Sequence, residues 1–150
     1  MTGKNRKNAY LYCEFRDEQF ALYDEYAKSH GMLMKTLLVV NALFYAKDGM
    51  TQTEMCKRTF QSKQTVNLII KNLLSGSYVT VAEVPENKRN KIVQMTAAGR
   101  AYCEKIVRHI IWAEDTAMSM FTPEEQKHLI ASSRTFTKNL TKLVNQKTED

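Results

Sequence analysis

The sequence predicts a mainly α-helical fold that carries one small β-hairpin. Apolar residues recur at intervals of three and four almost everywhere outside residues 78–96, which is the spacing of amphipathic helices. Within residues 78–96, two short runs, one of them rich in valine and tyrosine, flank the polar segment PENKRN and predict two strands joined by a loop. Two short helical patterns with a brief turn between them precede this hairpin. The order of four helices, a hairpin and two further helices is that of a winged helix-turn-helix with additional helices at both ends.

Composition favours one soluble domain without a membrane segment. The 150 residues are 43% hydrophobic and 25% charged, which suits a single core of ordinary size. The opening residues, MTGKNRKNAY, lack the apolar core of a signal peptide, and no apolar run approaches the roughly 20 residues that span a bilayer. Cys13, Cys56 and Cys103 are odd in number and far apart, which argues against a disulfide framework. We therefore expect a cytoplasmic protein.

The first predicted helix, residues 8–29, is apolar on two sides. One stripe consists of Leu11, Phe15, Leu22 and Tyr26, and the second, on nearly the opposite side, of Cys13, Phe20 and Ala27. A helix with two apolar sides needs two burial partners, and in so short a chain we expect the second partner to be another subunit.

Four further helices are predicted from capping residues at their starts or from apolar stripes along their lengths. Residues 32–47 should form a helix that ends at Asp48-Gly49, and Thr51 and Glu54 form a capping box for a helix over residues 52–58. The inward residues of the 32–47 helix should be Leu33, Leu37, Val40 and Phe44. A helix from about residue 97 to 120 carries Tyr102, Ile106, Ile110, Ala113 and Ala117 on one stripe. The sequence Thr122-Pro123-Glu124-Glu125 then begins the last helix, whose narrow apolar stripe consists of Leu129, Phe136, Leu140 and Leu143.

The helix over residues 62–74 separates an apolar stripe from a polar arc. The stripe consists of Val66, Ile69, Ile70, Leu73 and Leu74. The period of 3.6 residues places Gln64, Asn67 and Lys71 together on the opposite arc, with Lys63 and Thr65 at its flanks. Ser62 stands where it can cap the first turn. This helix presents a polar face to a partner.

Charge indicates that the partner is double-stranded DNA. Residues 51–100 hold eight basic and three acidic side chains, a net charge of +5, whereas the whole chain has +6. Gln64 and Asn67 offer paired donors and acceptors that match adenine in the major groove, and the apolar Leu68 could contact a thymine methyl group. Ser62, Lys63, Thr65 and Lys71 are assigned to phosphates, while Lys88, Arg89 and Asn90 would follow the adjacent minor groove. The plainer alternatives are a solvated basic surface, a Ser62 that only caps, and a Leu68 that is merely exposed or packed.

The sequence resembles the MarR family of winged-helix transcriptional regulators over nearly its whole length. The resemblance is sharpest in T-x-x-E at residues 51–54, S-K-Q-T-V at 62–66, N-K-R at 87–89 and I-V-Q-M-T-A-A-G at 92–99. It departs from the family where Asn87 replaces the aspartate of the wing and where Ser77 replaces a common glycine.

This resemblance implies a domain organisation and a function. Residues 32–96 would form the DNA-binding lobe, and residues 1–31 and 97–150 would mainly supply dimerisation helices. The expected activity is that of a ligand-responsive repressor, which binds a pseudo-palindromic operator as a homodimer. An effector pocket between lobe and dimerisation helices is implied as well. Its aromatic wall candidates are Tyr12, Phe15, Phe44, Tyr45 and Trp112, each of which could instead be a core residue.

Two alternative functions share this fold. Cys13 resembles in position the reactive cysteine of the hydroperoxide-sensing branch of the family, although a free cysteine is more often a small buried apolar residue. Alternatively, the chain is a winged-helix module that binds a protein partner or binds DNA without sequence preference. An enzyme is not expected, because no nucleophile, phosphate-binding or metal-binding motif is present and no cofactor is implied.

Overall fold

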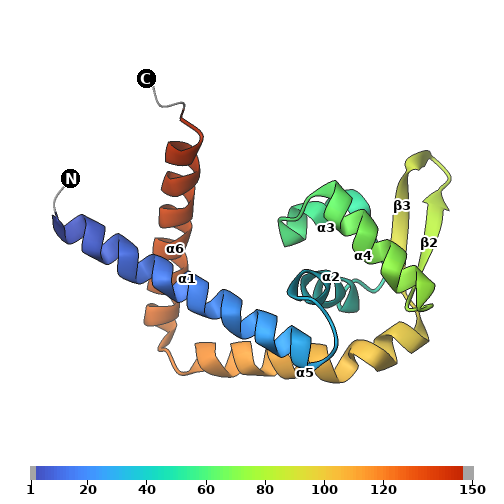
Figure 1. The fold of residues 1–150 in the computed structure, drawn as a ribbon, viewed down its shortest axis with the longest axis horizontal. Coiled ribbons are helices and arrows are strands. Elements are labelled where there is room, and N and C mark those ends of the chain that lie inside the picture. Colours follow the sequence, from blue (N-terminus) through green and yellow to red (C-terminus); the bar gives the residue numbers. More distant parts are fainter. Residues whose placement is uncertain (1–2, 147–150) are drawn as a thin grey trace. The chain divides into compact units, whose positions relative to one another are not determined.

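The computed structural model describes residues 3–146, apart from the side chains of residues 87–89. The elements, labelled in Figure 1, are α1 (Gly3–Ser29), α2 (Met34–Phe44), β1 (Met50–Thr51), α3 (Gln52–Thr59), α4 (Lys63–Ser75), β2 (Val79–Val84), β3 (Asn87–Met95), α5 (Ala97–Ser119) and α6 (Pro123–Val144). The chain divides into two compact units, and the boundary between Arg108 and His109 falls within α5. The mainly helical class and the winged arrangement predicted from the sequence are confirmed.

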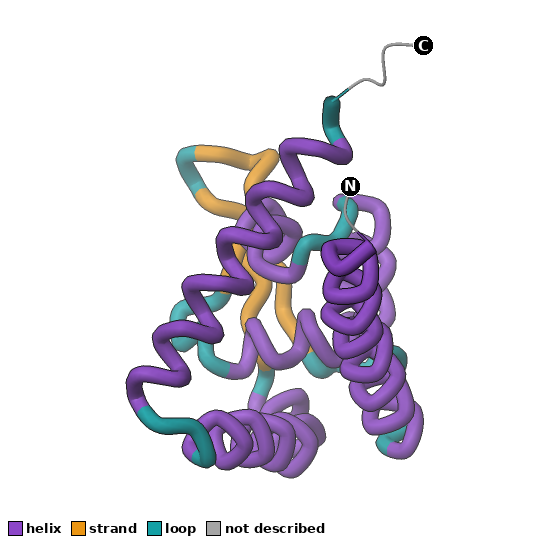
Figure 2. The backbone as a smooth tube through the Cα atoms, turned by 90° about the vertical axis from the view of Figure 1, so that its left-hand side faces the viewer, coloured by secondary structure: helices purple, strands orange, loops and turns teal. Residues whose placement is uncertain are grey.

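The first unit is built around a buried core to which α2 and α4 contribute most. From α2 come Leu37, Val39, Val40, Ala42, Leu43 and Phe44, and from α4 come Val66, Ile69, Ile70 and Leu73. A three-stranded antiparallel sheet in the order β1-β3-β2, orange in Figure 2, adds Met50, Val79 and Val93 to this core. One face of α4 is therefore fixed in this core, and the other face of α4 remains exposed.

The sheet differs from the two-stranded hairpin predicted from the sequence. Met50 pairs with Val93 and Thr51 with Ile92, so the two residues before α3 form a third strand. The second hairpin strand begins at Asn87 and not at Lys91, because a tight turn at Pro85 and Glu86 already reverses the chain. A register shift between Glu83 and Val84 absorbs the extra residues of β3 near the turn. Most of the predicted loop PENKRN is therefore strand.

Several boundaries and inward residues also differ from prediction. The first helix begins at Gly3, five residues before the predicted start, and α2 covers a shorter segment than residues 32–47. Leu33 precedes α2 at its N-cap and is 64% exposed, so it does not face inward as expected. Tyr102 is also exposed, because its ring stacks on Tyr78 at 4.6 Å between centroids and does not enter the core.

The link between α4 and α5 passes through a compact junction. Ser77 has φ of +58°, which places it in the left-handed region, and its carbonyl accepts a hydrogen bond of 2.8 Å from the Thr96 hydroxyl. The same hydroxyl oxygen accepts from the backbone N–H of Gly99 at 3.0 Å, so Thr96 caps the first turn of α5. Thr96 N–H donates to the Tyr78 carbonyl at 3.0 Å. The base of the hairpin is thereby fixed to α5.

The left-handed conformation of Ser77 leads to a stability prediction. Ser77→Gly is expected to raise the free energy of unfolding by about 0.5–1 kcal/mol, because glycine adopts this φ without the steric cost that a Cβ imposes. Urea unfolding followed by circular dichroism measures the change. Ser75→Gly is the control, because Ser75 lies within α4, where glycine is expected to lower the free energy of unfolding. A decrease for Ser77→Gly would contradict the prediction.

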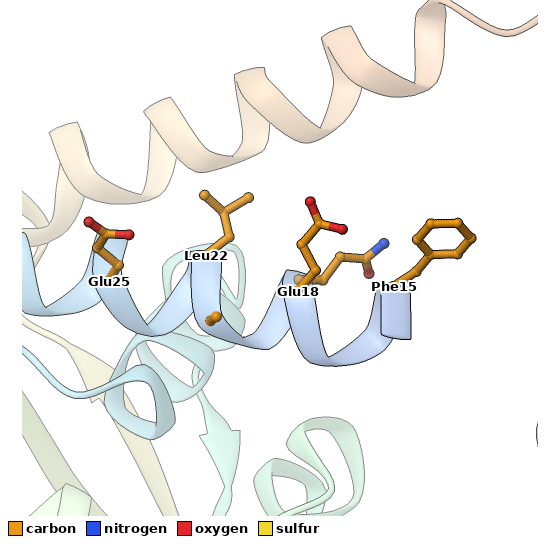
Figure 3. A pocket seen from close by; sticks show the side chains of 6 residues that line it. Phe15, Glu18, Leu22 and Glu25 are labelled. Carbon is orange, nitrogen blue, oxygen red and sulfur yellow. The ribbon is translucent and has the colours of Figure 1, made fainter. Parts of the chain in front are cut away.

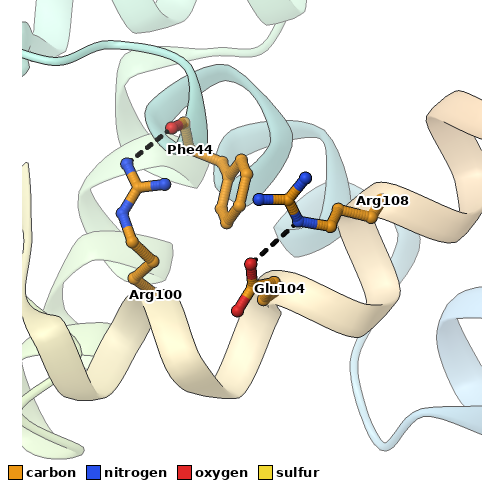
Figure 4. A network of polar contacts seen from close by, with 4 residues as sticks. All are labelled: Phe44, Arg100, Glu104 and Arg108. Carbon is orange, nitrogen blue, oxygen red and sulfur yellow. Dashed lines mark hydrogen bonds and ion pairs between the residues drawn. The ribbon is translucent and has the colours of Figure 1, made fainter.

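A polar link joins α2 to α5 inside the first unit (Figure 4). The Arg100 guanidinium donates a hydrogen bond of 3.0 Å to the Phe44 carbonyl and lies 4.5 Å from the centroid of the Phe44 ring. On the other side, Arg108 lies 6.0 Å from the same centroid and is held by Glu104 through a 2.8 Å ion pair. The link stabilises the contact of α2 with α5 through charge-assisted hydrogen bonding and cation–π attraction.

The second unit comprises the remainder of α5 and the whole of α6. The helix α6 begins at the sequence Thr122-Pro123-Glu124-Glu125 as predicted, and Thr122 and Glu125 form a capping box there. No residue of α6 is buried. Of its predicted apolar stripe, Leu129, Leu140 and Leu143 are exposed and Phe136 is half-buried.

Candidate nucleic-acid interface

The helix α4 has the two-sided character that the sequence predicts. Val66, Ile69 and Ile70 are at most 6% exposed, and Leu73 is 7% exposed. Leu74 is the exception among the five predicted stripe residues, since it is 42% exposed. It lies near the C-terminal end of the helix, where less of the core remains to cover it.

The polar arc of α4 is exposed along its length. Gln64, Asn67 and Lys71 form a row at helical spacing, and all three are exposed. Lys63 is exposed at the helix start, and Leu68 is 60% exposed beside the row. The structure therefore brings together five of the predicted site residues on one accessible surface, which we call the α4 polar face.

Ser62 and Thr65, which the sequence assigns to phosphates, form hydrogen bonds with each other. The Ser62 hydroxyl oxygen accepts from Thr65 N–H at 3.1 Å and donates to the Thr65 hydroxyl at 2.9 Å. Ser62 is thus an N-cap, as its position in the sequence suggests, and Thr65 is half-buried. These bonds fix the start of α4 and the directions of its first exposed side chains.

The turn before α4 contains two residues whose roles the sequence does not reveal. Phe60 adopts φ of +54° and is 95% exposed, directly ahead of the α4 polar face. The Gln61 amide donates to the Lys35 carbonyl at 3.0 Å and so attaches the turn to α2. Because this bond spans 26 positions, no local pattern could have identified it. For Phe60, the only sign in the sequence of an exposed position next to the site is that an aromatic residue stands in a short turn between two helices.

The helix α3 is capped as predicted. The Thr51 N–H and hydroxyl both donate to the Glu54 carboxylate, at 2.9 and 3.1 Å, and Glu54 N–H donates back to the Thr51 hydroxyl oxygen at 3.2 Å. The backbone and side-chain hydrogen bonds from Thr51 lower the pKa of Glu54. This capping box orients α3 beneath the turn that leads to α4.

The hairpin candidates are placed only in part. The side chains of Lys88 and Arg89 lie outside the described residues, although both positions belong to β3. Asn90 is half-buried in the same strand. Lys91, which is exposed, is paired in register with Glu83 of β2.

The five aromatic candidates for an effector pocket occupy different environments. Phe44 is buried beneath Arg100, and Tyr45 contacts it edge-to-face with centroids 5.2 Å apart. Tyr12 and Phe15 are exposed on α1, and Phe15 lines a shallow depression of that helix. Trp112, in the second unit, stacks on His109 at 5.5 Å. Tyr12, Phe15, Phe44 and Tyr45 thus belong to the first unit, whereas Trp112 belongs to the second.

All three cysteines are free thiols with different surroundings. Cys13 on α1 and Cys56 on α3 are half-buried, whereas Cys103 on α5 is fully buried. Burial raises the pKa of Cys103 to about 11.

Cys103 should therefore resist alkylation in the native protein. Since the thiolate is the reactive form, a pKa about two units above the ordinary value lowers its fraction at pH 8 roughly a hundredfold. Iodoacetamide is expected to modify Cys103 at least that much more slowly in the native protein than in urea, as measured by peptide mass spectrometry. Equal rates in both states would contradict the burial of this thiol.

Other kinds of site are not apparent in residues 3–146. No group of three or more histidine, cysteine, aspartate or glutamate side chains in this range is arranged to hold a metal ion. Within the same range, no helix combines the length and hydropathy needed to cross a bilayer.

A helix-turn-helix with an exposed second helix and a β-hairpin next to it defines the winged-helix class of proteins. Residues 30–90 match the model of the MarR family, which confirms the family resemblance seen in the sequence. The matched segment extends from the end of α1 into the hairpin and includes all of α4. No curated protein matches the sequence.

Solved structures of MarR-type regulators share the fold over most of the chain. The multidrug-efflux regulator MepR of Staphylococcus aureus, in a DNA-binding conformation, aligns with a TM-score of 0.77 and 19% identity, covering 89% of this chain and 98% of its own. AbsC of Streptomyces coelicolor aligns with a TM-score of 0.79 and 15% identity, covering 94% and 97%. NMB1585 of Neisseria meningitidis aligns with a TM-score of 0.75 and 16% identity, covering 96% and 97%. The described chain therefore has the MarR fold.

Proposed function

We propose that the protein is a sequence-specific DNA-binding transcriptional regulator that acts as a homodimer. The observation that carries the proposal is the α4 polar face. Gln64, Asn67 and Lys71 stand exposed on a helix whose opposite side is fixed in the core and whose start is capped by Ser62. A rigid helix with exposed amides and a lysine fits the major groove, where paired donors and acceptors distinguish the bases.

Each part of the site takes one role in the proposed complex. Gln64 and Asn67 read base edges, and Leu68 contacts a thymine methyl group. Lys63 and Lys71 contact phosphates, and the Thr65 hydroxyl, which accepts from Ser62, donates its own proton to a phosphate oxygen. Ser62 fixes Thr65 for this contact, while Lys88, Arg89 and Asn90 of the hairpin follow the minor groove. The net charge of +5 over residues 51–100 supports this assignment.

The homodimer is supported by the apolar residues that remain exposed outside the DNA-binding lobe. Phe15, Phe20 and Leu22 of α1 are more than 50% exposed, as are Leu143 and Val144 of α6. Two copies would place two α4 helices in successive major grooves, with half-site centres about 34–36 Å apart, so the operator would be pseudo-palindromic.

Regulation by a small molecule completes the proposal, with repression as the expected direction of control. MepR has been solved in complex with DNA, and DNA binding by BpsR of Bordetella bronchiseptica is regulated by 6-hydroxynicotinic acid. An effector of this chain would act by binding the DNA-competent and DNA-incompetent states with different affinities.

Selection of bound sequences from a random duplex pool tests the proposal. The purified protein is incubated with the pool and competitor DNA at near-physiological salt, and the bound fraction is sequenced. Enrichment of an inverted repeat with half-sites about one helical turn apart is the expected result. Binding that depends on salt without an enriched sequence would indicate a nonspecific DNA-binding module, and absence of binding would indicate a module for a protein partner.

A further inference from the structure

Phe60, in the turn between α3 and α4, adopts a backbone conformation that is unfavourable for its side chain. It is the C-cap residue of α3, and its φ of +54° and ψ of +36° lie in the left-handed region. Helices commonly end in this conformation, but the residue is usually glycine, because a Cβ raises the energy there. Since Phe60 is 95% exposed, burial within the chain offsets almost none of this cost. Strained residues of this kind are found mainly at functional sites.

The turn that carries Phe60 is fixed at several points. The backbone N–H groups of Phe60 and Gln61 both donate to the Cys56 carbonyl oxygen, the second at 3.2 Å. The Gln61 amide donates to the Lys35 carbonyl oxygen at 3.0 Å, and Ser62 caps α4 directly after the turn. The ring of Phe60 is therefore presented from an ordered backbone, so a partner does not have to order the turn when it binds.

Basic side chains flank Phe60 on both sides in the sequence. Lys57 and Arg58 end α3 and Lys63 begins α4, so all three lie within three positions of the ring, and all are exposed. In the part of the chain that the structure describes, no ion pair neutralises any of them. An apolar ring between cations is complementary to the backbone of DNA, where the carbon atoms of each deoxyribose lie between phosphates.

The exposed apolar side chains of α1 have the opposite surroundings. Figure 3 shows on that helix a depression lined by Phe15 and Leu22 together with Glu18 and Glu25. These carboxylates would repel the phosphates of a duplex. Exposure of an apolar side chain therefore does not by itself indicate DNA, and it is the positive charge around Phe60 that does.

We infer that Phe60 packs against a deoxyribose at the edge of the major groove, between phosphates that Lys57 and Arg58 contact on one side and Lys63 on the other. In helix-turn-helix complexes the first helix crosses the backbone and the start of the second contacts base edges, so the turn between them lies where the backbone borders the groove. The inference rests on the proposed function and adds to it a contact outside the α4 polar face.

The chemistry of this contact distinguishes it from those of the polar face. A ring against a sugar removes apolar surface from water, which strengthens binding to every sequence alike. The ring carries no charge, so the contact does not add to the release of counterions. Loss of the ring should therefore lower the affinity for DNA without changing either the sequence preference or the salt dependence.

Substitutions that keep the left-handed turn and remove the ring test the inference. Phe60→Asn and Phe60→Gly both tolerate this φ. Each is expected to weaken binding about tenfold, for the selected operator and for an unrelated duplex alike, with an unchanged slope of log K against log salt. Each should also raise Tm by about 2–4 °C, because the steric cost at this φ is relieved. Fluorescence anisotropy measures the affinities, and thermal unfolding followed by circular dichroism measures Tm.

Three further variants provide the controls. Phe60→Tyr keeps the ring and should bind the operator within about twofold of the wild-type protein. Ser77→Gly relieves a similar φ, +58°, beyond the opposite end of α4, so it should raise Tm and leave the affinity for DNA unchanged. Lys57→Ala combined with Arg58→Ala removes two phosphate contacts, so it should lower the salt slope by roughly 2, which loss of the ring should not do.

Each unfavourable outcome has a distinct meaning. Wild-type affinity of Phe60→Asn for DNA would overturn the inference, leave the proposed regulator standing and indicate a protein partner for the ring. Weaker binding together with a lower Tm would assign Phe60 a structural role and overturn it as well. A loss confined to one base pair would show that the ring reads a base, contrary to the inferred sugar contact. A wild-type protein that binds no duplex would overturn the proposed function and this inference together.

Discussion

Gly99→Ala is expected to lower the free energy of unfolding by about 3 kcal/mol, which for a domain of this size lowers Tm by roughly 10 °C. A Cβ at this position would lie 2.0 Å from the Tyr78 carbonyl oxygen and 2.9 Å from the Tyr78 carbonyl carbon. Both are backbone atoms of the junction that joins the hairpin to α5, so no side-chain rotation can remove the clash. Thermal unfolding followed by circular dichroism measures the loss.

A neighbouring position provides the control for Gly99. Ala98 is exposed in the same helical turn, and Ala98→Ser should change the free energy of unfolding by less than about 0.5 kcal/mol. If Gly99→Ala proved equally harmless, the close approach of α5 to Tyr78 would be wrong.

Asn67→Ala and Lys71→Ala are expected to weaken DNA binding in different ways. Loss of the Asn67 amide should remove about 1–3 kcal/mol of discrimination at one base pair, which corresponds to roughly a 5- to 150-fold loss of preference there. Loss of the Lys71 charge should weaken binding to all sequences and reduce the slope of log K against log salt by about 1. Titrations of the selected operator and of single-base variants at several salt concentrations measure both effects.

A charge outside the α4 polar face serves as the control for these titrations. Lys105 is exposed on α5, and Lys105→Ala removes the same charge as Lys71→Ala. It should leave both the salt slope and the sequence preference nearly unchanged. If Asn67→Ala and Lys71→Ala acted alike, the division between reading bases and contacting phosphates would be wrong.

Helices and caps were predictable because their signals are local. The periodicity of α4 identifies four of its buried residues and its exposed row, and the hydroxyl groups of Ser62, Thr51 and Thr122 cap the three helices as expected. Each signal lies within a few residues of the element that it produces. The sequence alone therefore suffices to outline the candidate DNA interface on α4.

Features that depend on distant partners could not be predicted in this way. Two residues, Met50 and Thr51, are too few to show alternation, and they form a strand only because Val93 and Ile92 are present to pair with them. The polar start of β3 likewise resembles a loop until its partner strand is known. The exposure of Leu33 and Leu74 depends on where the core ends, which periodicity alone does not determine.

We expect the bond from Arg100 to the Phe44 carbonyl to couple the opening of two segments of the native protein. The bond connects the last residue of α2 to the first turn of α5 across 56 sequence positions. Local unfolding of either helix end must break this bond, so the two segments belong to one cooperative unit. Their slowly exchanging amide protons should share one opening free energy in native-state hydrogen exchange, although the segments lie far apart in sequence.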